Sequence, residues 1–122
     1  MTVSANIGFG PKVAGEIVVL GKPGEVVESY QINSSCRGEI IIFLSYTPRE
    51  LLEKAGLVGV RGILVPSIHF RDYDYFEKAD DFSLLVLTKF GKLDIDSETA
   101  TKLSKLSGKR GILSGEGKNL EI

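Results

Sequence analysis

Apolar residues in this chain gather into short unbroken runs that are typical of buried strands. Three such runs lie in the second part of the sequence, at Glu39–Ser45, Val60–Val65 and Phe82–Thr88. A run of this length without polar alternation fits a strand that is covered on both faces, as in a parallel sheet. Pro66 follows the second run, and proline cannot donate a hydrogen bond to a central ladder. The pattern therefore predicts three core strands.

A helix is predicted between the first two of these strands. In Thr47-Pro48-Arg49-Glu50, Thr47 is expected to cap the helix, Pro48 to occupy its first position and Glu50 to complete a capping box. Gly56 is a natural stop at the far end of the helix. The apolar stripe expected to face the core consists of Leu51, Leu52 and Ala55.

Two more helices and two more strands follow in the same alternation. A short helix is predicted over Asp72–Ala79, and a further helix begins at Asp96 or Ser97 and stops at Gly108. The inward residues expected are Tyr73, Phe76 and Ala79 in the first of these helices, and Ala100, Leu103 and Leu106 in the second. Arg110–Leu113 is predicted as the last core strand, and Asn119–Ile122 as an edge strand.

The first part of the chain is rich in glycine and shows no helical periodicity. Val13–Leu20 predicts a strand, the turn residues 21–24 follow it, and Glu25–Tyr30 predicts a return strand that completes a hairpin. Residues 1–7 carry no periodic signal, and we expect them to be disordered or derived from an expression vector. Residues 8–122 are then one α/β domain, with a β-hairpin region at 8–38 and a βα repeat region at 39–122.

The alternation of strands and helices after residue 38 predicts the fold class. Helices of this length join parallel strands through right-handed crossovers. We therefore expect an α/β domain with a small, mainly parallel sheet and covering helices, flanked by the N-terminal Gly-rich β-hairpin.

Composition excludes several classes of function. The chain has 122 residues, of which 25% are charged, and a formal net charge of −1, which does not suit a nucleic-acid binder that works by phosphate neutralisation. One cysteine, Cys36, excludes an internal disulfide and a cysteine-clustered metal site. No apolar run is long enough to span a bilayer. We expect a cytoplasmic protein without a membrane, nucleic-acid, metal or cofactor partner.

The order of segments resembles the swivelling β/β/α domains, which include the phosphohistidine domain of phosphoenolpyruvate-utilising enzymes and the swivel domain of aconitases. The resemblance rests on the Gly-rich segment 8–38, the unit EIIIFLSYTPRELLEKAG at 39–56, the unit VGVRGILVPS that begins at Val58, and the closing segment KLSGKRGIL at 105–113. It is a resemblance of topology, and it implies a small domain that works as one part of a larger protein or assembly.

Polar side chains follow three of the predicted strands at the point where each strand ends. In an open α/β sheet these carboxyl ends meet at one edge, where ligands bind. The residues expected to gather there are Ser45, Thr47, Ser67, His69, Arg71, Asp72, Lys89 and Lys92. Of these, we take Thr47, Ser67, His69, Arg71, Asp72 and Lys89 as candidate binding residues.

His69 is the single histidine and the one candidate catalytic residue. As a phosphoryl acceptor or general base it would need Ser67 or Asp72 to orient its ring and Arg71 to hold an anion. The alternative is a loop histidine hydrogen-bonded near a helix start. Of the neighbouring aromatic residues, Tyr73 and Phe76 are expected in the core, whereas Phe70 and Tyr75 are expected to be exposed and would mark a partner surface.

These observations favour a non-catalytic binding or interaction module. The sequence holds no nucleophile–base pair at a diagnostic spacing, no metal cluster and no phosphate-binding glycine loop. The expected partner is another protein, a second copy of the chain or a small anion. Two alternatives stay open: a phosphohistidine-type phosphotransfer domain that uses His69, and a small-anion-binding domain at the strand-edge crevice.

Overall fold

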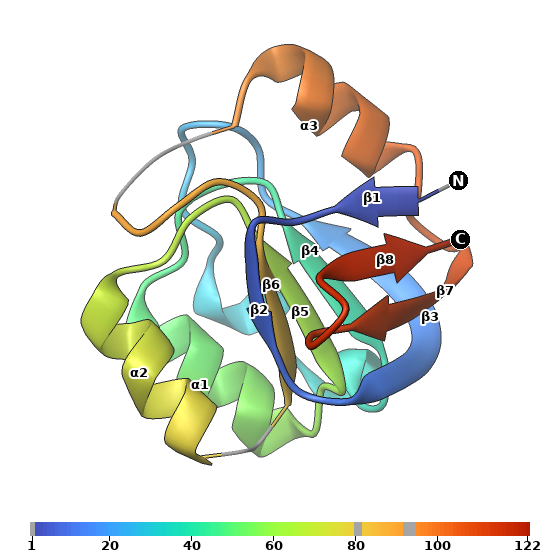
Figure 1. Cartoon of the computed structure of the whole chain (residues 1–122). Helices are drawn as coiled ribbons and strands as arrows, with labels where there is room; N and C mark the ends of the chain where they lie inside the picture. The colour runs from blue at the N-terminus through green and yellow to red at the C-terminus, as the bar shows by residue number, and fades with distance from the viewer. Residues whose placement is uncertain (1, 80–81, 92–94) are drawn as a thin grey trace.

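The strand order of the sheet sets the architecture (Figure 1). The computed structural model describes residues 2–79, 82–91 and 95–122, and within them the strands form one sheet in the order β1-β8-β7-β3-β4-β5-β6-β2. The strands are β1 (Thr2–Ser4), β2 (Ile7–Phe9), β3 (Lys12–Leu20), β4 (Ile40–Phe43), β5 (Gly62–Val65), β6 (Ser83–Val86), β7 (Arg110–Ser114) and β8 (Asn119–Glu121). The helices are α1 (Arg49–Val58), α2 (Phe70–Ala79) and α3 (Ser97–Ser104).

Four neighbouring strands, β3 to β6, run parallel. Helix α1 connects β4 to β5 and α2 connects β5 to β6, and both helices cover the same face of the sheet (Figure 1). Every residue of β4, β5 and β6 is buried, as their unbroken apolar sequences predicted. The expected alternation of strands and helices from β4 to β7 is confirmed.

The predicted fold class, a small and mainly parallel sheet, is wrong, because the strands outside β3 to β6 all pair antiparallel. The pairs β1–β8, β7–β8, β3–β7 and β2–β6 are all antiparallel. Because β2 occupies the open edge of β6, β7 cannot extend the parallel series there and pairs instead with β3. Asn119–Ile122 was expected at an edge, but β8 lies between β7 and β1. The molecule is a mixed sheet of eight strands with three helices among the described residues.

The predicted N-terminal hairpin also does not form. Its first strand is confirmed as β3, but β3 already has β7 on one side and β4 on the other, so no edge is open for a return strand. After β3 the chain turns tightly, with the Glu25 N–H donating to the Lys22 carbonyl at 3.0 Å. Val27 is then buried in the core. The 3₁₀ helices Ser29–Gln31 and Ser34–Cys36 lead on to β4.

The first residues of the chain close the sheet. β1 and β2 stand at opposite ends of the strand order, yet only Ala5 and Asn6 separate them in sequence. The Ala5 N–H donates to the Lys118 carbonyl beside β8 (2.9 Å), and the Asn6 N–H donates to the Val86 carbonyl in β6 (3.1 Å). The sheet therefore curls until its two ends meet. The sequence predicted a disordered start because strands of three residues carry no periodic signal.

Glycine makes this closure possible. A Cβ on Gly115 would overlap the backbone carbonyl of Phe9, and a Cβ on Gly8 would lie 2.5 Å from the Gly115 oxygen. The Glu116 N–H donates to the Gly10 carbonyl at 2.9 Å. β2 and the turn between β7 and β8 thus meet backbone to backbone, which a side chain at these positions would prevent.

Two clusters of buried apolar residues lie on opposite faces of the parallel strands. Along β4, Ile41 and Phe43 belong to the cluster under α1 and α2, whereas Ile40 and Ile42 belong to the cluster under α3. The second cluster also includes residues of the antiparallel strands, because the curled sheet folds back over its own face. None of the described helices has the length and apolar character needed to cross a membrane.

The helix ends agree only partly with the predictions. Helix α1 starts one residue later than expected, with Pro48 as its N-cap and no capping side chain, because the Thr47 hydroxyl donates to the Ser45 carbonyl instead. The helix runs through Gly56 and stops at Gly59, whose φ of 98° is left-handed. For α3 the expected cap is confirmed, since the Asp96 carboxylate accepts the Thr99 N–H.

Candidate functional site

The carboxyl ends of β4, β5 and β6 form one rim, because parallel strands that are neighbours end on the same side. The loops after β5 and β6 are joined there. Ile68 forms a parallel bridge with Phe90, and the Gly91 N–H donates to the Ile68 carbonyl at 2.9 Å. The Thr88 hydroxyl donates to the Pro66 carbonyl at 2.7 Å. Polar groups of the rim therefore hold its loops in place.

Two of the candidate binding residues are buried in the rim. Thr47 is 1% exposed, and its hydroxyl is used in the 3.2 Å bond to the Ser45 carbonyl. Ser67 is also 1% exposed. Both side chains lie beneath the surface, so a ligand would have to displace a loop before it reached them.

His69 lies at the surface, directly before α2. Its carbonyl accepts the N–H groups of Asp72 and Tyr73, at 3.0 and 3.1 Å, and its Nδ1 accepts the Arg71 N–H at 3.2 Å. His69 thus satisfies the first free N–H groups of α2. A ring nitrogen that accepts a bond carries no proton, so neutral His69 holds its proton on Nε2. This is the arrangement expected of a loop histidine near a helix start.

The remaining candidates differ in exposure. Arg71 and Lys89 are exposed, and Asp72 is half-buried in the first turn of α2, where a carboxylate favours the helix dipole. Lys92 lies outside the described residues. Burial raises the pKa of the nearby Tyr46 hydroxyl, and the negative charges of Asp72 and Glu50 raise it further. The rim is therefore mixed in charge.

Ser45 at the end of β4 stands apart from the other rim residues. It is 2% exposed, and its hydroxyl is the single buried side-chain oxygen or nitrogen without a hydrogen-bond partner in the part of the chain that the structure describes. A Cβ placed on Gly21 would lie 3.3 Å from this hydroxyl, so the serine faces the turn after β3. The sequence placed Ser45 at the rim but contained no sign that its hydroxyl would be unpaired.

A second surface lies across α1 and α2, and we call it the helix-pair surface. The guanidinium carbon of Arg49 lies 3.9 Å from the centre of the Tyr75 ring, and Arg49 also pairs with Glu53 at 2.8 Å. The hydrogen bond to Glu53 raises the pKa of Arg49. Leu57 lies on the same face of α1 as Arg49 and Glu53, and it is 89% exposed. Tyr75, at 44%, and Phe70, at 58%, are exposed as predicted.

Two hollows flank Tyr75 on the helix-pair surface. The first, of about 540 Å³, is lined by Arg49, Arg71, Asp74, Tyr75 and Lys78. The second, of about 200 Å³, is lined by Glu53, Gly56, Leu57, Tyr75 and Phe76. Lys78 is paired with Asp74 at 3.1 Å, whereas Arg71 has no ion pair among the described residues. One side of Tyr75 is thus cationic and the other largely apolar.

The aromatic residues of α2 divide as the sequence predicted. Phe76 is buried, and Tyr73 is half-buried with its hydroxyl donating to the Gly8 carbonyl at 3.2 Å. Burial, followed by the charge of Glu77, raises the pKa of Tyr73. The side chain of Ala79, the third inward residue predicted, lies outside the described residues.

The described residues contain no cluster of histidine, cysteine, aspartate and glutamate side chains suited to a metal ion. Asp96, in the acidic run before α3, uses its carboxylate to cap that helix, and this bond to Thr99 lowers its pKa. Asp94 of the same run lies outside the described residues.

Comparisons with known proteins place the fold. Neither the protein-family models nor the curated proteins give a match. Among solved structures, a UPF0107 protein determined by solution NMR superposes with a TM-score of 0.63 at 10% identity, over 100% of this chain and 98% of that chain. The RNA-processing inhibitor RraA from Thermus thermophilis superposes with a TM-score of 0.56 at 13% identity, over 100% and 80%. At such identities the likeness shows the fold alone.

These neighbours correct the resemblance drawn from the sequence. The matching structures are a UPF0107 protein and RraA, and they contradict the assignment to phosphohistidine or aconitase swivel domains. That assignment rested on the order of strands and helices. Order along the chain does not specify strand direction, and four of the strand pairs here are antiparallel.

Proposed function

We propose that this protein is a non-catalytic interaction module that binds another protein through the helix-pair surface. The observation that carries the proposal is the exposure of Leu57 and Tyr75 beside Arg71, which forms no ion pair with a described residue. Large apolar side chains that gather on one face mark interaction sites more often than scattered ones do. Aromatic residues and arginine are also the residues that contribute most at protein interfaces.

The state of the rim supports the same conclusion. A general base or phosphoryl acceptor needs an orienting partner and access to substrate. The Nδ1 of His69 accepts the Arg71 N–H, and Thr47 and Ser67 are buried. The polar groups of this edge therefore serve the loops and the start of α2 rather than an exposed reaction centre.

The fold comparison is compatible with a regulatory role. One protein of this fold is described as an RNA-processing inhibitor. For this chain, we infer a partner surface that offers an apolar side chain to the hollow beside Leu57 and a carboxylate to Arg71. The Arg49–Glu53 pair between them provides a polar border.

Negative charges placed on the helix-pair surface test the proposal. The partner is first captured from native extract with the wild-type chain, then purified, and its affinity is measured by calorimetry. Leu57→Glu and Arg71→Glu are each expected to weaken binding at least about tenfold, which corresponds to about 1.4 kcal/mol. Ile112→Glu is the matched control, because Ile112 is 45% exposed on β7, away from this surface. Equal weakening by all three variants would reject the helix-pair surface.

A second measurement addresses catalysis directly. The wild-type chain is assayed for phosphate-ester, peptide and carboxyl-ester hydrolysis, and is incubated with phosphoryl donors before mass spectrometry under alkaline conditions. We expect neither turnover nor a phosphorylated residue. Turnover that disappears in His69→Ala, or phosphate found on His69, would contradict a non-catalytic role.

A small anion at the rim is a second candidate, favoured by Ser45. Its unpaired hydroxyl lies three residues before the N-cap of α1, where no side chain caps the helix. Free N–H groups at a helix start attract anions. A phosphate titration followed by amide NMR is expected to shift residues 45–51 and to lose this effect in Ser45→Val. Shifts confined to other residues would exclude the rim as an anion site.

A further inference from the structure

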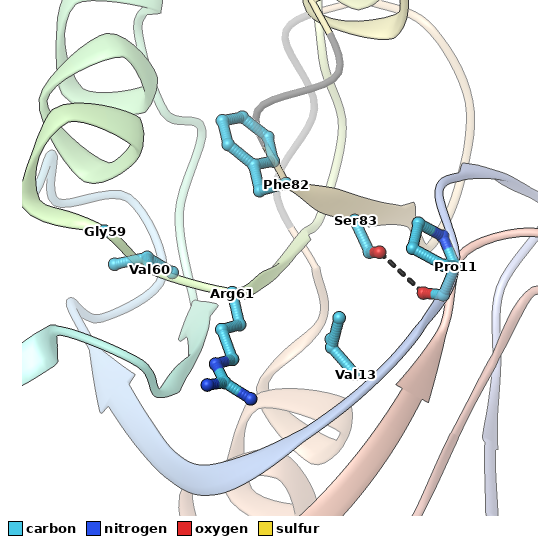
Figure 2. Close-up of a pocket in the computed structure, with 7 residues that line it drawn as sticks. All are labelled: Pro11, Val13, Gly59, Val60, Arg61, Phe82 and Ser83. Atoms are coloured by element: carbon cyan, nitrogen blue, oxygen red, sulfur yellow. Dashed lines mark hydrogen bonds between the residues drawn. The ribbon is translucent and has the colours of Figure 1, made fainter.

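A separate hollow opens at the opposite end of the parallel strands, where β5 and β6 begin (Figure 2). Its volume is about 430 Å³, within the range of small-molecule sites. Seven residues line it: Pro11, Val13, Gly59, Val60, Arg61, Phe82 and Ser83. Neither the rim nor the helix-pair surface shares any of these residues, so the hollow is independent of the function proposed above.

The walls of the hollow expose polar and apolar surface in similar amounts. Its accessible apolar surface comes from exposed Pro11 and half-buried Val13 at the start of β3, whereas Val60 and Phe82 are buried (Figure 2). The Ser83 hydroxyl is fully buried and donates to the Pro11 carbonyl at 2.6 Å, so its proton is not available to a ligand. Such walls suit an aromatic ring or a short aliphatic chain.

Two arginines stand at one side of this hollow. Arg61 lines it directly, and the Arg37 side chain lies over Gly59, with its Cγ 3.3 Å from the place a Cβ would occupy. The two side chains come from adjoining segments, because the Gly38 N–H donates to the Gly59 carbonyl at 2.9 Å. Both guanidinium groups are therefore positioned on the same edge.

Neither arginine forms an ion pair with another described residue. The carboxylate nearest in sequence to Arg37, that of Glu39, accepts the Glu16 N–H at 2.5 Å and is thus held toward β3. The Arg61 N–H donates to the Glu39 carbonyl, which fixes the backbone from which its side chain extends. The edge consequently carries two cations that form no ion pair with a described side chain.

We propose that this hollow binds a small organic anion, a carboxylate or phosphate carried on an apolar ring or short chain. The apolar body packs against Pro11 and Val13, and the anionic group reaches Arg61 and Arg37. Guanidinium groups bind carboxylates and phosphates through paired N–H donors, which gives such a site both affinity and orientation.

A titration of the full chain with phenyl phosphate and with benzoate, followed by amide NMR, tests the proposal. We expect saturable shifts at residues 59–62 and 82–84 with at least one of the two probes. Benzyl alcohol, which has the ring without the charge, is expected to bind about tenfold more weakly, and so is inorganic phosphate, which has the charge without the ring.

Charge-removing variants identify the cations. Arg61→Gln and Arg37→Gln are each expected to raise the dissociation constant about fivefold to tenfold. Arg110→Gln is the matched control, because Arg110 is an exposed arginine on β7 that lines a different surface. The proposal is overturned if neither probe shifts residues 59–62, if the shifts fall only at the rim, or if the control loses as much affinity as the two test variants.

Discussion

Arg49 and Tyr75 hold the two covering helices together at the surface, with the guanidinium carbon 3.9 Å from the centre of the ring. Arg49 is at the first position of α1, and Tyr75 is in the middle of α2. The ring also meets the buried Phe76 edge to face, with the two centroids 5.0 Å apart. This contact therefore connects the exposed helix-pair surface to the core beneath it.

Removing the ring should loosen this surface without unfolding the protein. Tyr75→Ala is expected to lower the melting temperature by a small amount and to increase amide exchange in the first turn of α1, because exposed cation–π contacts are weak. Arg49→Gln and the double variant complete a mutant cycle monitored by thermal unfolding. Strict additivity of the two single changes would mean that the two groups do not interact in solution.

The unpaired hydroxyl of Ser45 predicts an unusual response to truncation. Ser45→Ala removes a buried polar group that has no hydrogen-bond partner among the described residues, so the free energy of unfolding should stay unchanged or rise by up to about 1 kcal/mol. Ser83→Ala is the matched comparison, because the Ser83 hydroxyl is bonded to the Pro11 carbonyl. That variant should lose about 1–2 kcal/mol. Denaturant unfolding measures both, and a large loss in Ser45→Ala would reveal a partner of that hydroxyl.

Closure of the sheet depends on Gly115. A methyl group at this position would overlap the Phe9 carbonyl, so Gly115→Ala should destabilise the fold by about 3 kcal/mol. Gly24→Ala tests backbone conformation alone, since nothing lies within 4 Å of its added Cβ and its φ is +81°. The expected cost there is about 1 kcal/mol. Similar losses in the two variants would show that crowding at Gly115 is relieved by a small shift.

Asp96 predicts a pH dependence of stability. The bonds from Thr99 favour the ionised carboxylate in the folded protein and lower its pKa. Its contribution is therefore complete above the pKa of the unfolded state, which is about 3.9, and is lost as the pH falls through the lower folded value. Asp96→Ala should be less stable than wild type at pH 7, and the difference should shrink in acid. A difference that stays constant from pH 7 to pH 2 would contradict this account.

The sequence predicted individual elements better than their arrangement. The apolar runs at β4, β5 and β6 and the inward residues Ala100 and Leu103 of α3 are local patterns, and each is confirmed. Leu106 is buried as predicted, but it lies beyond α3, which ends at Ser104 and not at Gly108. The direction of β7 is not a local property. Arg110–Leu113 pairs antiparallel with β3 because β2 covers the far edge of β6, and β2 is too short to be recognised from three residues.

The rim and the hydroxyl of Thr47 show the same difference between what a local sequence pattern predicts and what tertiary packing decides. Parallel strands bring the loops after β5 and β6 together, as the sequence predicted. Burial of Thr47 and Ser67 depends on how those loops pack, which no spacing of residues specifies. Thr47 has the sequence of a helix cap, but its hydroxyl bonds to the Ser45 carbonyl, and Pro48 takes the cap position.

Because Thr2 lies opposite Glu121 in the sheet, β1 has no partner strand until the ribosome has synthesised β8. Pairings between residues so distant in sequence are slow to form, and until they do the nascent chain exposes the unpaired edges of β1 and β7. A stop codon placed before Asn119 would remove β8 and leave β1 and β7 without their shared partner strand. The released polypeptide should then be a substrate for chaperones and proteases.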